Sequence, residues 1–128
     1  MRYLLLVNTD PDLLDALPPA QQDDMMRECV AHAAELRESG TLLASQRLAP
    51  VETATTVRIR NGRMSTTDGP FAETREHFAG YNLIEARDLN DAIRIAQQFP
   101  WARTGSIEIR PLADLPATPE DVKPGWRG

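Results

Sequence analysis

The sequence has few of the features that mark secreted, membrane or metal-binding proteins. It contains one cysteine, Cys29, in 128 residues, so an internal disulfide has no second partner. Its first apolar run, residues 3–7, is too short for a membrane span or for the apolar core of a secretion signal. These absences predict a protein of a reducing compartment, and we expect it in the cytoplasm.

Motifs for metals, nucleotides and nucleic acids are missing as well. There is no HExxH, no spaced Cys/His set and no calcium loop, and neither GxxxxGK[ST] nor GxGxxG occurs. The chain carries 14 Lys and Arg against 19 Asp and Glu, a net charge of −5, which is the wrong sign for nucleic acid or an anionic membrane. We expect no metal, no cofactor, no nucleic acid and no membrane, and as partners small molecules or proteins.

What is present is typical of one globular domain. Hydrophobic residues make up 41% of the chain and charged residues 26%, and 128 residues are enough for a single core. The last segment, residues 113–128, is rich in proline and glycine. We therefore expect a domain over residues 1–112, followed by a C-terminal tail over residues 113–128.

Periodicity and turn residues predict the order strand, helix, strand, hairpin, strand, helix, strand. The ranges are 3–7, 19 to before Gly40, 41–48, 55–67 around Asn61-Gly62, 78–85, 88 to before Pro100, and 106–111. The continuous apolar run 3–7 is typical of a central strand. The expected buried stripes are Met25, Cys29, Ala33 and Leu36 on the first helix, widened by Met26 and Val30, and Leu89, Ala92, Ile93 and Ala96 on the second.

The hairpin prediction includes a register. Asn61-Gly62 is a preferred pair for a two-residue turn. Such a turn places Ile59 opposite Met64 and Arg60 beside Arg63, so we expect one buried side and one solvated side.

The predicted order also has a consequence for assembly. Two crossover helices can cover only one face of a four-stranded sheet. A symmetric second copy covers the other face with the same surface, so we expect a homodimer.

Several motifs closely resemble the DGPF-type branch of the YCII-related family. They are residues 67–74 (TDGPFAET), Gly80, residues 84–86 (IEA), residues 88–89 (DL) and residues 105–111 (GSIEIRP). The resemblance covers residues 1 to about 112. It implies an α+β, ferredoxin-like βαββαβ fold with an inserted β-hairpin, in which an antiparallel sheet with helices on one face pairs into a dimeric α+β barrel.

The resemblance also suggests functions. The broader family is associated with enzymatic activity through a histidine and an aspartate in a cleft. Here the helix position expected for that histidine holds Cys29, and the expected Asp-Pro pair is Phe99-Pro100. We expect a small-molecule-binding dimeric barrel with cofactor-independent acid/base chemistry. The alternative is a non-catalytic interaction or sensing module of an extracytoplasmic-function sigma factor system, since some members are encoded near such factors.

The predicted catalytic residues are Asp68 and His77. Asp68 acts as a general acid or base if its loop lies at the barrel mouth; otherwise it only builds the turn by accepting hydrogen bonds from the backbone two residues on. A strand period of two puts His77 and Tyr81 on one face, where they could hold a ligand together. Otherwise His77 is a surface residue and Tyr81 belongs to the core.

The predicted ligand-binding residues share ionisable or aromatic side chains near this cluster: Glu73, Arg75, Tyr81, Glu108 and Arg110. The charged residues between 73 and 77 either converge on a ligand or form a solvated loop. Glu108 and Arg110 either form an ion pair or leave the guanidinium to bind an anion. The sequence identifies neither the ligand nor a reaction.

Four further residues allow more than one interpretation. Cys29 and His32 are spaced i, i+3 and could form a nucleophile pair, but a small core residue is the better interpretation of Cys29. Trp126 should be exposed unless the tail docks on a partner subunit, whereas Trp101 should be half-buried.

Overall fold

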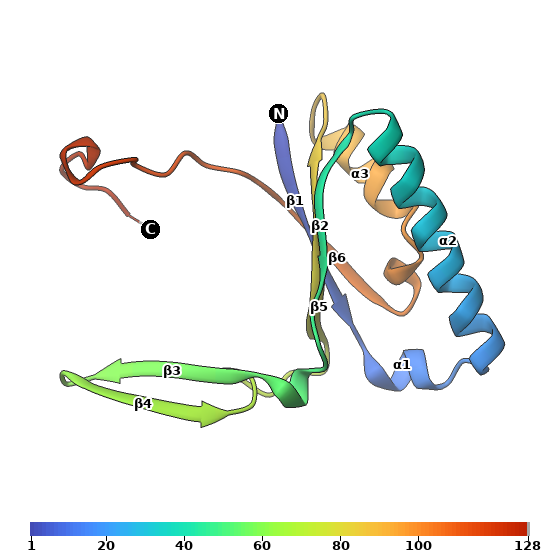
Figure 1. Ribbon diagram of the computed structural model, residues 1–128, viewed down its shortest axis with the longest axis horizontal. Coiled ribbons are helices and arrows are strands. Elements are labelled where there is room, and N and C mark those ends of the chain that lie inside the picture. The colour runs from blue at the N-terminus through green and yellow to red at the C-terminus, as the bar shows by residue number, and fades with distance from the viewer. Residues whose placement is uncertain (128) are drawn as a thin grey trace.

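A four-stranded antiparallel sheet is the centre of the computed structural model, which describes residues 1–127 (Figure 1). Its strands lie in the order β2-β5-β1-β6, with the bounds β1 (Arg2–Thr9), β2 (Leu42–Arg47), β5 (His77–Glu85) and β6 (Gly105–Pro111). The apolar run of β1 lies between β5 and β6, which confirms the predicted central strand. The chain therefore has the predicted α+β, ferredoxin-like topology with a hairpin inserted between β2 and β5.

The two long helices, α2 (Pro19–Glu38) and α3 (Leu89–Gln97), lie on the same face of the sheet (Figure 1). Proline is tolerated in the first turn of α2, and Gly40 follows its end with a φ of +80°, as predicted. The side chain of Asp88 caps α3 by accepting from the Asp91 N–H at 2.8 Å.

Short elements complete the chain. They are the helix α1 (Pro11–Asp15) and the 3₁₀ turns η1 (Val51–Thr53), η2 (Pro100–Arg103) and η3 (Pro119–Asp121). The predicted order of elements has no helix between the strand over residues 3–7 and the helix that begins at residue 19, so α1 corrects it. α1 forms because the Asp10 carboxylate accepts from the Asp12 N–H at 3.0 Å and proline fits the first turn.

The core lies between the helices and the sheet. Leu5, Ile84, Ala92, Ile95 and Phe99 are almost completely buried there. The central stripe predicted for the first helix is confirmed, because Met25 is buried and Cys29, Ala33 and Leu36 pack against the core. The predicted widening is wrong at Val30, which is 59% exposed because it lies at the cavity rather than against the core.

The stripe predicted for the second helix is only half right. Ala92 and Ala96 are buried, but Leu89 and Ile93 are 51% and 43% exposed. The buried side runs through residues 92, 95, 96 and 99, the i, i+3, i+4, i+7 pattern, so Ile95 takes the place assigned to Ile93.

The inserted hairpin forms a separate two-stranded sheet of β3 (Thr55–Arg60) and β4 (Arg63–Asp68). Asn61 and Gly62 both have positive φ, and the predicted pairing of Ile59 with Met64 is confirmed. The expected buried side is wrong for the single chain, in which Ile59 and Met64 are each 64% exposed. The reason is that the hairpin projects away from the main sheet (Figure 1).

The C-terminal tail projects on the same side of the sheet as the hairpin, at the opposite end (Figure 1). Between these two arms lies the sheet face that the helices leave uncovered, called the open face here. Register places one set of apolar side chains on it: Leu4, Leu6, Phe78, Tyr81 and Leu83. Trp126 in the tail is 46% exposed, and Trp101 is half-buried as predicted.

Candidate functional site

A cavity of about 920 Å³ separates the middle and the C-terminal half of α2 from strands β2 and β5. It forms because α2 and the sheet diverge from the C-terminal toward the N-terminal end of the helix (Figure 1). The apolar wall includes Val7 of β1, Met26 and Val30 of α2, and Trp101 of η2. A mostly apolar hollow with a few polar groups is typical of a small-molecule site.

Two polar side chains from neighbouring strands face this cavity. Ser45 and Asn82 are directly paired across β2 and β5, and the Ser45 hydroxyl donates to Asn82 Oδ1 at 2.6 Å. Asn82 is only 7% exposed, and within residues 1–127 its Nδ2 has no hydrogen-bond partner. A buried amide with spare donors is ready to bind a ligand oxygen or a water molecule.

Gly80 lets β2 approach β5 closely next to Asn82. A Cβ at this position would lie 2.5 Å from the main-chain oxygen of Gln46, which is too close for any side chain. The small side chain of Ser45 pairs with Asn82, and Gly80, which has no side chain, pairs with Arg47. The cavity therefore reaches the backbone of β5 at Gly80.

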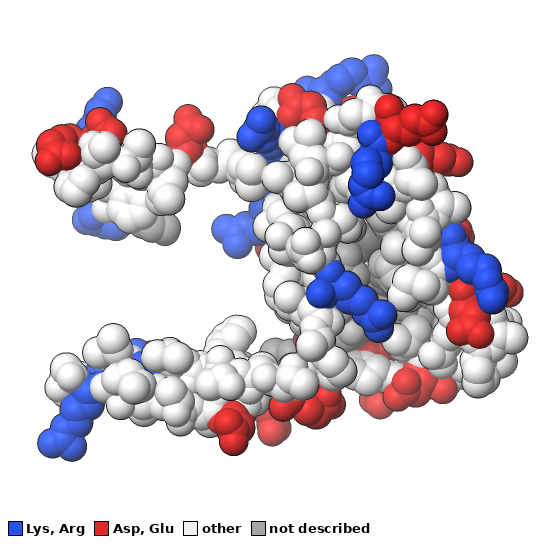
Figure 2. All heavy atoms as spheres, in the orientation of Figure 1, with Lys and Arg blue, Asp and Glu red and all other residues white. Residues whose placement is uncertain are grey.

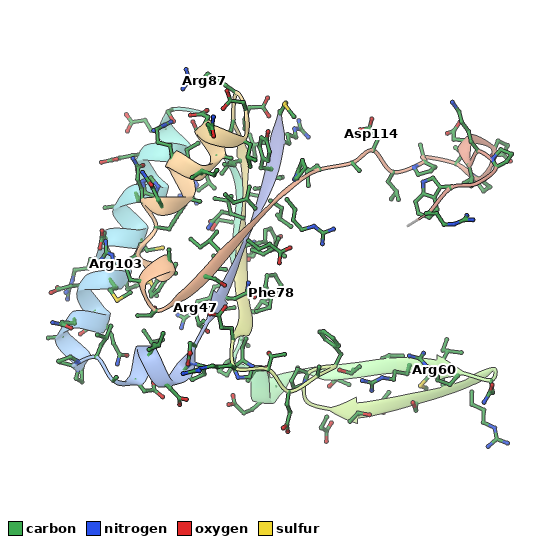
Figure 3. The ribbon with its side chains drawn as sticks, turned by 180° about the vertical axis from the view of Figure 1, so that it is seen from behind. Arg47, Arg60, Phe78, Arg87, Arg103 and Asp114 are labelled. Carbon is green, nitrogen blue, oxygen red and sulfur yellow. The ribbon has the colours of Figure 1, made fainter. Side chains whose placement is uncertain are left out.

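Arginine side chains border the cavity from both layers. Arg37 extends from α2 and Arg47 from β2, and neither takes part in an ion pair within the described chain. Figure 2 shows basic groups in blue around the opening between the helices and the sheet, and Figure 3 shows Arg47 on the helix side of the sheet. Glu52 is an acidic residue at the same cavity. The two free guanidinium groups favour a ligand that carries negative charge.

His77 lies at the end of this cavity, on the helix side of the sheet. A β-bulge at Ala79 shifts the register, so Val7 pairs with Gly80 whereas Asn8 pairs with Phe78 and Thr9 with His77. The prediction that His77 and Tyr81 share a face is therefore wrong, because the extra residue reverses the alternation between them. Phe78 and Tyr81 face the open side instead, as Figure 3 shows for Phe78.

A shallower hollow of about 480 Å³ adjoins His77 near the base of the hairpin. Glu73 and Thr74 line it together with η1 and the turn at Gly69. The structure thus places Glu73 near His77 as predicted, although Glu73 is exposed.

Other predicted site residues are elsewhere. Asp68 is exposed at the end of β4 on the hairpin. The alternative role predicted for Asp68, accepting a hydrogen bond from the backbone two residues on, is wrong because that residue is Pro70, which has no N–H. Arg75 donates to the buried carboxylate of Asp10 at 3.0 Å and so fastens the loop before β5 to α1.

Glu108 and Arg110 lie on the open face at the edge strand β6. Their charged atoms are 3.8 Å apart, which matches the ion-pair alternative of the prediction. Register places both beside Leu6 and Leu4 of β1, on the side of the sheet away from the cavity. Together with Tyr81, they form a second polar group, separate from His77.

Cys29 and His32 do not act as a pair. The Trp101 Nε1–H donates to Cys29 Sγ at 3.2 Å. His32 is buried against the edge of Phe99, and its Nε2 lies 3.2 Å from the main-chain oxygen of Ile95. Both residues therefore connect α2 to neighbouring elements, although Cys29 also borders the cavity.

Displaced pKa values occur at ion pairs outside the cavity. Hydrogen bonds from Arg103 lower the pKa of Glu28, linking η2 to α2. The pKa of Asp91 is lowered first by the main-chain N–H of Arg87 and then by the side chain of Arg94. The arginines that lower these pKa values form ion pairs that stabilise the packing of neighbouring elements, and the shifts reflect those ion pairs.

The described residues contain no group of three or more His, Cys, Asp or Glu side chains placed to hold a metal ion. Within the same residues, no helix is long and apolar enough to cross a membrane.

Sequence reasoning missed the side chains that define the cavity: Arg37, Ser45, Arg47 and Asn82. One signal was available in the sequence. Asn82 lies two residues before Ile84 in the same strand, so it shares the buried face with an apolar residue although its own side chain is polar. The remaining residues become neighbours only through the angle between α2 and the sheet, which periodicity does not encode.

These features define a ferredoxin-like α+β protein with a cavity between its helices and its sheet. The chain belongs to the YCII-related family, whose domain model matches residues 1–116. It is 36% identical over 115 residues to the uncharacterized protein R00369 of Rhizobium meliloti (strain 1021), covering 88% of this chain and 93% of that protein.

A solved structure has a similar fold. It is 5-chloro-2-hydroxyhydroquinone dehydrochlorinase (TftG) from Burkholderia phenoliruptrix AC1100, in complex with 2,5-dihydroxybenzoquinone. The TM-score is 0.52, with 88% of this chain and 94% of the other covered. At 10% sequence identity, the likeness supports the fold alone.

Proposed function

We propose that this protein binds a small organic anion in the cavity between α2 and the sheet. The observation that carries the proposal is the buried Asn82 amide, whose free Nδ2 lies at a cavity that two unpaired arginines border. The amide supplies hydrogen-bond donors, Arg47 supplies positive charge, and the apolar wall covers the rest of the molecule. TftG, with a similar fold, binds a dihydroxybenzoquinone, which is a molecule of suitable size and polarity.

The proposed chemistry is proton transfer by His77 without a cofactor. Histidine changes charge near neutral pH, and His77 lies at the cavity where a bound molecule would meet it. Glu73 lines the adjoining hollow together with His77 and is the proposed polar partner of the imidazole. Asp68, the other predicted catalytic residue, lies on the hairpin and takes no part in this step within one chain.

The same proposal includes a cytoplasmic homodimer. A second copy would cover the apolar side chains of the open face, as the predicted assembly requires. The cytoplasmic location is supported by the single free thiol, Cys29.

A matched pair of fluorescent probes tests the cavity. The anion 8-anilinonaphthalene-1-sulfonate and the uncharged N-phenyl-1-naphthylamine have similar apolar bodies. We expect Arg47→Gln to weaken binding of the anion about tenfold, the size of one charge-assisted hydrogen bond, and to change binding of the neutral probe less than about twofold. Val30→Trp, which fills the cavity, should weaken both probes in fluorescence titrations.

The control is Arg60→Gln, which removes the same charge from the hairpin and should leave both affinities unchanged. If Val30→Trp leaves the binding of both probes unchanged, the probes bind outside the cavity and the proposal is contradicted.

Proton transfer can be tested separately. Hydroxylated aromatic and carboxylic compounds that bind are incubated with the protein in deuterium oxide, and hydrogen exchange at carbon is followed by nuclear magnetic resonance. We expect exchange that His77→Gln slows at least about 100-fold while binding persists. Binding without any exchange would contradict the acid/base step and leave the binding site intact.

A second candidate function is a non-catalytic interaction or sensing module. The exposed apolar side of the hairpin, with Val57 62% exposed, favours it because such surfaces often contact other proteins. Ligand binding with no exchange in the experiment above supports this candidate.

A further inference from the structure

The hairpin and the tail are two arms that have no cover within one chain. We propose that the hairpin of each copy lies along the C-terminal tail of a second copy, so that two such contacts clasp the dimer. The inference rests on the homodimer proposed above and adds to it the contact between arms.

The apolar content of both arms supports a protein partner. On one side of the hairpin, Val57, Ile59 and Met64 are each more than 60% exposed. In the tail, Leu115 is 80% exposed and Trp126 is 46% exposed. A two-stranded hairpin is only marginally stable in water by itself, so a covering surface would stabilise it.

The direction of the arms makes the second copy the fitting occupant. Both arms extend beyond the open face, at opposite ends of it (Figure 1). Six-residue strands are about 20 Å long, whereas packed sheets lie about 10 Å apart. When a second open face packs on the first, each hairpin must therefore pass alongside the other copy. A two-fold axis can bring it next to the partner's hairpin or next to the partner's tail.

Charge distinguishes these two arrangements. The hairpin carries Arg58, Arg60 and Arg63 and one acidic residue, Asp68, at its base, so its outer part from position 55 to position 67 is purely basic. Residues 113–122 of the tail carry three carboxylates and no basic residue, and Lys123 and Arg127 follow them. Within residues 1–127, none of these arginines and carboxylates forms an ion pair.

Pairing two hairpins would bring like charges together, whereas pairing a hairpin with a tail brings opposite charges together. Figure 2 shows basic groups at the outer end of the hairpin and acidic groups along the tail, with acidic groups toward the base of the hairpin and basic groups at the far end of the tail. Figure 3 labels Arg60 and Asp114 on the two arms. The observations therefore favour the contact between hairpin and tail.

Charge reversal tests the contact by sedimentation equilibrium of the full chain. We expect the double variant Arg60→Glu/Arg63→Glu to raise the dimer dissociation constant at least about tenfold, because each contact then pairs acid with acid. Asp114→Lys/Glu120→Lys should do the same. Combining all four substitutions should restore the wild-type constant to within about threefold.

The matched control is Arg27→Glu combined with Gln21→Glu and Gln97→Glu, which changes the net charge by the same amount at exposed helix positions and should leave dimerisation unchanged. A wild-type dimer that is insensitive to Arg60→Glu/Arg63→Glu would overturn the clasp but not the dimer. A wild-type monomer at all concentrations would overturn both.

Cross-linking identifies the residues in contact. The sequence contains one lysine, Lys123, so Arg60→Lys introduces a specific site for a zero-length carbodiimide linker. In mixtures of ¹⁴N- and ¹⁵N-labelled chains, we expect linked peptides that join position 60 to residues 113–122 of the other isotope. A carbodiimide joins an amine to a carboxylate, so a contact between two hairpins is detected by adding Ser65→Glu to the Arg60→Lys variant. Cross-links that then join only two hairpin peptides would overturn the proposal.

Discussion

At the scale of single residues, Asp91 shows how one carboxylate organises a helix end. Its side chain is only 9% exposed and accepts hydrogen bonds from the Arg87 N–H at 3.0 Å and from the Arg94 guanidinium at 2.8 Å. Its own N–H donates to Asp88. These bonds favour the charged form and lower the pKa of Asp91 below its usual value, so the group stabilises the fold only while ionised.

We expect Asp91→Asn to lower the melting temperature by about 4 °C at pH 7. Because the pKa is lower in the folded state, the stabilisation is present above the unfolded pKa of about 4 and is lost as the pH falls below it. The difference between wild type and variant should therefore shrink between pH 5 and 2, as followed by circular dichroism. Asp24→Asn, at the exposed pair with Arg27, is the control and should change little. An equal difference at both pH extremes would contradict the assignment.

The site residues could be predicted only in part, and the reason also lies at this scale. The ionisable side chains near residue 77 pointed to the region where His77 and Glu73 border adjoining hollows. Asn82 and Arg47 were missed because an isolated polar residue in a strand looks the same whether it faces a cavity or a solvated surface.

At the scale of elements, strands and turns followed the sequence closely because their signals are local. Asn61-Gly62 determined the hairpin register, and the apolar run in β1 determined the central strand. The faces of β5 could not be predicted, because the bulge at Ala79 depends on pairing with β1. Close packing of strands is also invisible in a sequence pattern. Gly105 illustrates it, since a Cβ there would lie 2.0 Å from the main-chain oxygen of Asn8.

Gly105→Ala should lower the free energy of unfolding by about 3 kcal/mol, because β6 must move away from β1. Gly62→Ala strains the hairpin turn, where φ is +72°, but the hairpin is a separate sheet. We therefore expect it to change global stability by less than about 1 kcal/mol. Urea unfolding followed by Trp101 fluorescence compares the two variants. Equal losses of stability would show that the clash at β6 is relieved without strand movement.

At the scale of the whole molecule, the helices cover one sheet face, and two arms border the other (Figure 1). The number of helices already predicted an uncovered face, which is why this aspect of the architecture could be inferred from the order of elements. The projection of the hairpin could not, because an alternating strand pattern predicts a buried side without saying which chain buries it.

The proposed dimer leads to a direct prediction for the open face. Leu6→Arg places a charge beside Leu83 and Tyr81, at the centre of the proposed contact, and should convert the protein to a monomer at micromolar concentration in sedimentation velocity. Leu89→Arg introduces the same side chain at an exposed position on the helix side and is the control. An unchanged dimer in Leu6→Arg would show that the copies associate through another surface.

The bulge in β5 also affects how relatives of this protein can diverge. The one extra residue at Ala79 is what separates the histidine from the face that carries Tyr81. Deleting that codon would remove the bulge and leave His77 on the cavity side and Phe78 on the open side, because the pairs Val7–Gly80 and Asn8–Phe78 would become consecutive. A relative of unchanged length whose strand lacks the bulge would instead carry position 78 at the cavity and position 77 on the open face. In comparisons between family members, a one-residue gap at this position therefore preserves the chemistry of the cavity, whereas an ungapped strand without the bulge exchanges an imidazole for the side chain at position 78.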